Sequence, residues 1–435
     1  MCHNFSPPRI LAQPLSALFF TYIFVAALAL SVAVRFWLAS RQIRHVATHR
    51  DRVPADFAQR IPISAHQRAA DYTVARVRIG MIELVVGTAV LVAFTLLGGL
   101  QWLHAQLAAA LPGWPFARQL TFVVCVALVG AIVDLPLAWY RQFRLEQRFG
   151  FNRMTPALWI ADLAKGTAVT ALLGIPLLAA VLWLMQRAGQ SWWLWAWLVW
   201  VGFNLCVLVF YPTVIAPLFN KFEPLADGPV RSRVEALLAR CGFASRGVFV
   251  MDGSRRSAHG NAYFTGLGKA KRIVFFDTLL QRLSGEEVEA VLAHELGHFK
   301  RRHILKRIAL SFALSLAGLW LLGWLAGRPW FYQGLGVTVD ADREAVALVL
   351  FFLALPVFTF MLQPIASLAS RRHEFEADAY AAKQSRAQDL VSALVKLYED
   401  NASTLTPDPV HSAFYDSHPP ASQRIGRLNR LIPSA

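Results

Sequence analysis

Three residues in the second half of the chain, His294, Glu295 and His298, have a spacing that suits metal-assisted hydrolysis. On a helix, residues four apart lie on one face, so the two imidazoles can reach one zinc ion. Glu295 lies about 100° round the helix and is free to act on a water molecule. An accidental match at a solvated helix end is the alternative, but chance rarely produces this run in a chain with 12 histidines. The run therefore predicts a zinc centre.

A catalytic zinc site takes three protein ligands, and the sequence offers a third one after the last apolar run. Glu374 and Asp378 are four residues apart on an expected helix. Glu374 could bind the metal while Asp378 orients a ligating histidine. Glu376 and His373 are rivals for the same role, and Glu374 is the preferred ligand. An exposed charged helix face beside a membrane is the alternative interpretation.

The histidines need a helix to present them, and the sequence predicts one that begins after Ser284. Ser284 and Glu287 form a capping box, in which each side chain bonds the backbone of the other residue. An apolar stripe with helical spacing follows, formed by Val288, Val291, Leu292 and Leu296.

Two other segments could serve a substrate near the zinc centre. Residues 258–265 and 272–277 are apolar stretches with a glycine-containing link, which is typical of a β-hairpin. An edge strand there could bind an extended peptide, although the pattern alone favours an ordinary sheet core. Near the C-terminus, His418 and Arg424 could donate to an oxyanion, although each residue alone is more typical of a surface.

The composition indicates a membrane protein. Hydrophobic residues make up 56% of the 435 residues and charged residues only 16%, whereas soluble domains carry about 25% charged residues. This excludes a disordered chain, a collagen and a disulfide-rich scaffold. Seven apolar runs can each cross a bilayer, which takes about 20 residues, and each must be helical to satisfy its backbone. They cover residues 15–34, 84–103, 120–140, 166–185, 192–215, 308–326 and 345–362.

The net charge of +16 is distributed in a pattern typical of membrane proteins. Residues 35–78 hold nine arginines against three aspartates, and the segments after the third and fifth apolar runs are also basic. The alternate loops carry few basic residues. By the positive-inside rule, the N-terminus lies outside and the C-terminus in the cytoplasm. The basic charge therefore favours a membrane surface, and no nucleic acid is expected as a partner.

The spans divide the chain into four segments. Residues 1–215 form an N-terminal membrane region with five helices, and residues 304–366 hold the sixth and seventh. Residues 216–303, with the zinc helix, and residues 367–435, with the third ligand, both fall on the cytoplasmic side. Together they can form one soluble α+β domain of about 150 residues. The expected fold is an all-α membrane protein with a cytoplasmic metal-binding domain.

Taken together, the motifs resemble those of the Ste24-type membrane zinc metalloproteases, the type I CaaX prenyl proteases of peptidase family M48. The resemblance covers most of the chain and extends to the order of the motifs and the count of seven spans. It rests on HELGH at 294–298, HEFEAD at 373–378, NAYFTG at 261–266, RIVFFDTLL at 272–280 and SHPP at 417–420 with Arg424.

The resemblance implies roles for the residues around the metal. One zinc ion per chain would be bound by His294, His298 and Glu374. Glu295 would be the catalytic acid/base, and Asp378 would support the ligands.

The resemblance also implies how a substrate is held. His418 and Arg424 would lie near the reacting carbonyl. The substrate would be a peptide or protein, prenylated or membrane-associated, cleaved after the isoprenylated cysteine of a CaaX box. Seven helices in the lipid bilayer would enclose a water-filled chamber capped by a zincin-like domain, which would also explain Glu83 and Asp134 in the spans. The substrate backbone would lie on a strand formed by Asn261, Ala262, Tyr263 and Phe264.

Other functions fit parts of the sequence. Gly260 replaces the serine that eukaryotic relatives tend to have, and the tail lacks a dilysine-like retrieval signal, which together favour a bacterial inner-membrane homologue. Bacteria generally lack protein prenylation, so an HtpX-type quality-control endopeptidase is the first alternative. A site-2-type protease is disfavoured because charged residues flank the HELGH run. A metal-free seven-helix transporter is disfavoured because the two halves show no similarity. The oligomeric state is left open.

Overall fold

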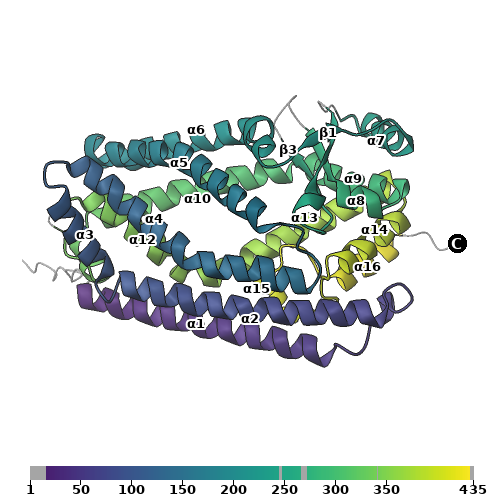
Figure 1. Ribbon diagram of the computed structural model, residues 1–435, viewed down its shortest axis with the longest axis horizontal. Coiled ribbons are helices and arrows are strands. Elements are labelled where there is room, and N and C mark those ends of the chain that lie inside the picture. Colours follow the sequence, from purple (N-terminus) through teal and green to yellow (C-terminus); the bar gives the residue numbers. More distant parts are fainter. Residues whose placement is uncertain (1–15, 244–246, 266–271, 340, 432–435) are drawn as a thin grey trace, which may run out of the picture.

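The computed structural model describes residues 16–243, 247–265, 272–339 and 341–431. Within these residues, seven helices are long and apolar enough to cross a membrane, as predicted. They run broadly along the long axis of the molecule, with a small β-sheet and shorter helices at one end (Figure 1). Their main α-helical parts are α1 (Ala17–Thr48), α2 (Ile63–Phe94), α4 (Pro115–Tyr140), α5 (Pro156–Arg187), α6 (Trp192–Phe210), α10 (His303–Ala326) and α12 (Arg343–Thr359), and the last helix continues without a break to Gln384.

The second of these helices differs from the expected span at 84–103. Helix α2 ends at Phe94, and a separate helix α3 (Gly99–Ala110) follows. The chain turns at Gly98, whose φ of +78° is a conformation that glycine adopts without steric cost. The prediction of these bounds was wrong because the apolar run continues through the turn, and hydropathy alone does not register the break. The first expected span began at Leu15, which lies outside the described residues.

The last apolar helix, α12, belongs to the protein interior. Of its most apolar window, 56% is buried inside the protein, compared with 6–11% for the other six helices. It packs against α1, α4, α5 and α10. The chain continues through η8 (Phe360–Leu362) into α13 (Gln363–Gln384), the helix that carries Glu374. The preferred third ligand therefore lies on the direct continuation of a buried membrane helix.

A four-stranded sheet lies at the end of the molecule opposite α3 (Figure 1), with strand order β1-β2-β4-β3. The predicted hairpin is confirmed, because β3 pairs antiparallel with β4 and Ala262 lies opposite Phe275. Within the described sheet, β3 is an edge strand. The strands are β1 (Phe222–Pro224), β2 (Val248–Met251), β3 (Ala262–Thr265) and β4 (Arg272–Phe276). The helices around them are α7 (Pro229–Arg240), α8 (Asp277–Arg282), α9 (Gly285–Lys300), α14 (Ala387–Asp400), α15 (Pro409–Tyr415) and α16 (Ala421–Asn429).

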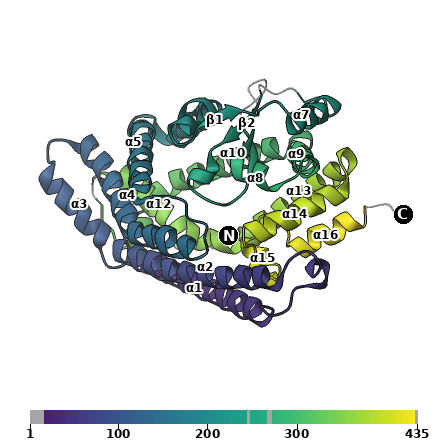
Figure 2. The same ribbon diagram turned by 45° about the vertical axis from the view of Figure 1, so that its right-hand side comes forward.

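Helix α9 lies among these elements and carries the HELGH run (Figure 2). Its predicted capping box is confirmed: Ser284 Oγ accepts from the Glu287 backbone at 3.3 Å, and Glu287 Oε2 accepts from the Ser284 backbone at 2.8 Å. The apolar stripe of α9 is buried in a core shared with α7, α14 and the sheet. Because this core fixes the rotation of α9 about its axis, His294 and His298 face α13.

Candidate metal centre and active site

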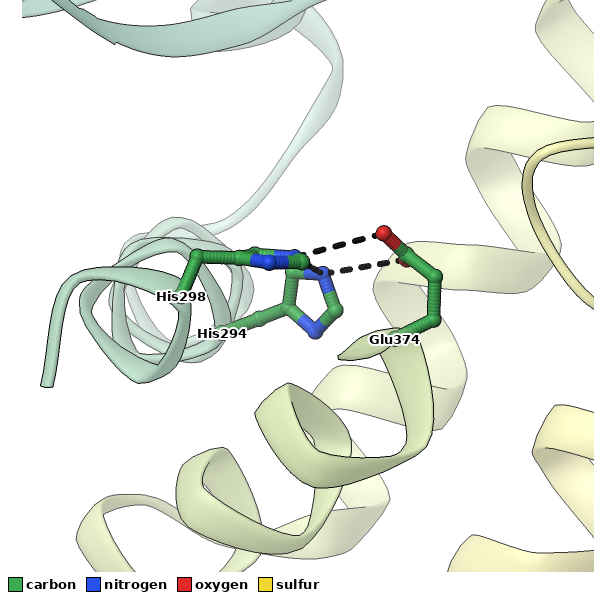
Figure 3. Close-up of side chains that lie close together, drawn as sticks. All are labelled: His294, His298 and Glu374. Atoms are coloured by element: carbon green, nitrogen blue, oxygen red, sulfur yellow. Dashed lines mark hydrogen bonds and ion pairs between the residues drawn. The ribbon is translucent and has the colours of Figure 1, made fainter. Parts of the chain in front are cut away.

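Helices α9 and α13 bring the three predicted metal ligands together (Figure 3). His294 Nε2 lies 3.4 Å from one oxygen of Glu374, and His298 Nε2 lies 3.3 Å from the other. The two Nε2 atoms are 3.2 Å apart. All three candidate ligand atoms lie within 4.8 Å of one another. Two residues of one helix turn and one carboxylate from a distant helix therefore converge on a single point.

The polar atoms at this point fit a bound cation. Glu374 Oε2 is buried and has no hydrogen-bond donor among the described residues, which is costly for a carboxylate oxygen. Burial lowers the pKa of His294, but the carboxylates of Asp378 and Glu374 outweigh this effect and raise it to about 9. The surrounding negative charge thus favours a positive charge at this position. Two imidazoles and one carboxylate are also the donor set of many catalytic zinc sites.

Asp378 and Arg424 lie behind the candidate ligands. Asp378 Oδ1 is 2.8 Å from His294 Nδ1, where it can hold the imidazole by its second nitrogen. Arg424 donates to Asp378 through Nη2 at 2.6 Å and through Nε at 2.9 Å, and both side chains are buried. The remaining nitrogen, Nη1, lies 3.6 Å from Glu374 Oε2. The main partner of Arg424 is therefore Asp378, and its contact with the ligand Glu374 is longer.

Glu295 and His418 line a cavity of about 1140 Å³ that also exposes His294 and Glu374. Burial raises the pKa of Glu295, which makes its carboxylate a stronger base than an exposed one. His418 Nε2 lies 3.5 Å from Glu374 Oε1, and burial lowers the pKa of His418, which favours the neutral imidazole. Ser417 Oγ is 3.0 Å from His418 Nδ1, so a hydroxyl proton donated there leaves the imidazole proton on Nε2.

The predicted substrate strand reaches the same cavity at one end. Asn261 and Ala262 line it. Tyr263 and Phe264 make ring contacts within the sheet region, with Phe276 and Phe243 respectively. Of the four predicted substrate-binding residues, Asn261 and Ala262 are therefore the two that the structure places at the cavity. Gly266, the last residue of the NAYFTG run, lies outside the described residues.

A polar cluster on the cavity wall was missed by the sequence analysis. Tyr72 on α2 donates to Glu146 at 2.7 Å, and Glu146 also lies 3.7 Å from His259 Nε2. His259 Nδ1 is 3.0 Å from the side-chain oxygen of Asn401 at the end of α14. Glu146 belongs to a π-helical turn, η2 (Arg141–Glu146), that continues α4. The cluster connects two membrane helices to the segment before β3. The sequence contained one clue to it, because His259 lies beside the NAYFTG run.

The two ionisable residues noticed in the spans have different surroundings. Glu83 lines the cavity and forms an ion pair with Arg141, as expected of an ionisable group in a membrane helix. Asp134 is exposed on α4 and is not among the residues that line the cavity.

The rival ligands Glu376 and His373 contact a residue outside the ligand set. Glu376 Oε2 lies 3.1 Å from Nε2 of the buried residue His303. His373 stacks on the same ring, with centroids 4.0 Å apart. The sequence analysis missed His303, although its place five residues after His298 was a usable signal.

Comparison with known proteins gives a consistent result along the whole chain. Residues 42–221 match the family described as CAAX prenyl protease N-terminal, five membrane helices, and residues 224–432 match peptidase family M48. The chain is 36% identical to CAAX prenyl protease 1 homolog of Arabidopsis thaliana, covering 76% of this chain and 80% of that protein. It is 31% identical to the Homo sapiens homolog, covering 94% and 96% respectively.

A solved structure agrees with these matches. The crystal structure of S. mikatae Ste24p superposes with a TM-score of 0.88 at 30% identity, covering 94% of this chain and 99% of that one. The fold and the family matches therefore agree. The structure has seven apolar helices, a small sheet and the HExxH helix, and the family matches cover both halves of the sequence. The chain belongs to peptidase family M48, as a multi-pass membrane metalloendopeptidase of the Ste24 type.

Proposed function

We propose that the chain binds one zinc ion through His294, His298 and Glu374 and uses it to hydrolyse peptide bonds. The observation that carries the proposal is the convergence of these three side chains at a cavity, with a buried Glu374 oxygen that lacks a hydrogen-bond donor among the described residues. Zinc supplies a Lewis acid that polarises the scissile carbonyl and lowers the pKa of water.

The side chains around the metal supply proton transfer, oxyanion stabilisation and orientation of the ligands. Glu295 takes the proton of the attacking water and passes it to the leaving amine, a role that suits its raised pKa. His418 donates from Nε2 to the developing oxyanion, and the positive charge of Arg424 adds to this stabilisation through Nη1. Asp378 accepts from Nδ1 of His294 and keeps Nε2 free for the metal.

The substrate lies as an extended peptide along the open edge of β3, where main-chain hydrogen bonds hold it next to the metal centre. Asn261 and Ala262 line the cavity there, and Tyr263 and Phe264 contribute through the strand backbone. The relatives named CAAX prenyl protease 1 support a peptide that ends in a CaaX box and is cleaved after an isoprenylated cysteine. The cavity extends from the metal ligands to α2 and η2 and offers room for such a substrate.

The test of this specificity is a comparison of two peptides that differ only in prenylation. Purified protein should cleave a farnesylated CaaX peptide faster than its unprenylated twin, and phenanthroline should abolish both reactions. Equal rates would remove the prenyl specificity and favour a general membrane quality-control endopeptidase. Failure to cleave either peptide, with zinc bound, would contradict the proposed peptidase activity on this class of substrate.

The proposed orientation places the N-terminus outside and the metal centre and C-terminus in the cytoplasm, in a bacterial inner membrane. The arginine-rich segment 35–78 supports this orientation. Residues 216–303 and 367–435 form one metal-binding domain, in which α9 packs on both α13 and α14. Reporter fusions in the loops after α3 and after α4 test the orientation, because only the loop after α4 should report a cytoplasmic position.

A further inference from the structure

A hydrogen-bonded chain leads away from the metal centre on the side of His298. His303, the first residue of α10, has a side chain that is 2% exposed, and its Nδ1 lies 3.1 Å from Nδ1 of His298. Its other nitrogen, Nε2, lies 3.1 Å from Oε2 of Glu376. Neither His303 nor Glu376 has a role in the proposed function.

The atom types determine where each proton lies along this chain. A metal ligand at Nε2 of His298 is unprotonated there, so a neutral His298 carries its proton on Nδ1 and donates it. Nδ1 of His303 must then accept, which leaves the proton of His303 on Nε2. That proton is donated to the carboxylate of Glu376. With His298 as a neutral ligand, this is the arrangement in which each nitrogen donor meets an acceptor.

We propose that His303 and Glu376 are positioning residues, which hold His298 in the tautomer and ring orientation that direct its Nε2 to the metal. The proposal rests on the proposed function, since it needs a metal at His298. His294 is supported in another way, directly by the carboxylate of Asp378 at 2.8 Å. The two imidazole ligands thus have separate supports, one a carboxylate and the other an imidazole backed by a carboxylate.

His303 also fills space, and this role must be separated from its hydrogen bonds. Its ring stacks on His373 with centroids 4.0 Å apart and an interplanar angle of 13°. Phenylalanine at position 303 keeps a stacking ring but removes both hydrogen bonds. Glutamine removes the ring but keeps one acceptor and one donor at the end of the side chain. The pair His303→Phe and His303→Gln therefore distinguishes positioning from packing.

The experiment measures the zinc affinity of the purified full-length protein by competition with a chelator. Loss of an outer hydrogen-bond partner weakens metal binding about 10–100-fold, so His303→Phe should lose that much and His303→Gln clearly less. Glu376→Ala should also weaken zinc binding. This variant tests the proposal independently if His303→Phe does not fold. The visible absorption of Co²⁺ bound in place of zinc should change in His303→Phe and return towards wild type in His303→Gln.

His66→Phe is the matched control. His66 is 1% exposed on α2 and makes one hydrogen bond to the His49 carbonyl, at 2.9 Å. This variant should lose thermal stability while its zinc affinity stays unchanged.

Three results would overturn the proposal. Wild-type zinc affinity in both His303→Phe and Glu376→Ala would remove the positioning role while leaving the metal centre intact. A loss of zinc affinity in His303→Gln that is as large as or larger than the loss in His303→Phe would assign the effect to the ring and its packing rather than to the hydrogen bonds. A wild-type protein that binds no zinc would overturn the proposed function together with this inference.

Discussion

Gly297 on α9 lies directly against Ala377 on α13. A β-carbon on Gly297 would be 2.9 Å from the Ala377 Cα, a distance that real β-carbons essentially never show, and 3.0 Å from the Ala377 carbonyl oxygen. Gly297 lies between the two histidine ligands, directly before His298, and Ala377 lies one turn beyond Glu374. The missing side chain in the HELGH run therefore permits the helix approach that brings the ligands together.

Gly297→Ala should force α9 and α13 apart. Overpacking of this kind costs about 1–3 kcal/mol of stability, and zinc affinity should fall because the histidines and Glu374 separate. Gly318→Ala on α10 is the control, because its β-carbon would meet nothing within 4 Å and alanine favours a helix. Thermal unfolding and chelator competition measure both effects. Unchanged zinc affinity in Gly297→Ala would show that the close contact is not needed to assemble the ligands.

Glu295→Gln should keep the metal and lose turnover, because the amide cannot accept the proton of the attacking water. General base catalysis contributes about 10²–10⁴-fold, which sets the expected loss of rate. Metal analysis and peptide cleavage on the same preparation measure the two properties. Glu289→Gln, which changes a carboxylate of α9 paired with arginines of α7, should leave both unchanged. A metal-free Glu295→Gln protein would contradict the division of roles.

Asp378→Asn should weaken zinc binding about 10–100-fold, because His294 loses its carboxylate support. The same change removes the nearer of the two carboxylates paired with the buried guanidinium of Arg424 and leaves only Glu374 at 3.6 Å, so stability should fall by up to about 3–5 kcal/mol. Adding Arg424→Met should restore much of the stability and none of the zinc affinity. If the double variant regained zinc affinity as well, Asp378 would act through Arg424 rather than through His294.

Glu287→Gln should destabilise the protein at neutral pH by about 1.5–3 kcal/mol, because charged hydrogen bonds are lost. Burial raises the pKa of Glu287, but hydrogen bonds from Lys396 and Ser392 and from the Ser284 backbone outweigh it and lower the pKa. A lowered carboxyl pKa stabilises the fold above the unfolded value, about 4.3, and this contribution fades as pH falls through the folded value.

Thermal unfolding at pH 7 and at pH 4 therefore compares wild type with Glu287→Gln. The difference in Tm should be largest at pH 7 and smaller at pH 4. Glu235→Gln, in an exposed pair with Arg231 at 2.8 Å, should change Tm little at either pH. A difference that grows on acidification would mean that Glu287 is not held ionised in the folded protein.

Local patterns were the parts of this molecule that could be predicted from sequence. The capping box at Ser284 and the antiparallel hairpin at 262–276 depend on neighbouring residues, and both are present. The seven apolar helices follow from length and hydropathy, since lipid leaves the backbone no other partners. His294 and His298 could be predicted as ligands because their four-residue spacing puts both on one helix face, and Glu374 because it shares a helix face with Asp378.

Features that depend on the tertiary arrangement could not be predicted in the same way. Hydropathy does not separate a core helix from a lipid-facing one, so the buried position of α12 was not foreseen. The end of α2 is set by the turn at Gly98, inside an apolar run. His303 and Glu376 are 73 residues apart, and only the tertiary fold brings the first residue of α10 to α13 and makes them partners.

Zinc content and peptide cleavage, measured together on the purified wild-type protein and on Glu374→Ala, test the metal centre most directly. We expect one zinc per wild-type chain, loss of cleavage on removal by phenanthroline, and recovery when zinc is added back. Glu374→Ala should bind zinc weakly and stay inactive under the same conditions. Cleavage that persists after complete removal of zinc, or full zinc binding and activity in Glu374→Ala, would contradict a centre built from His294, His298 and Glu374.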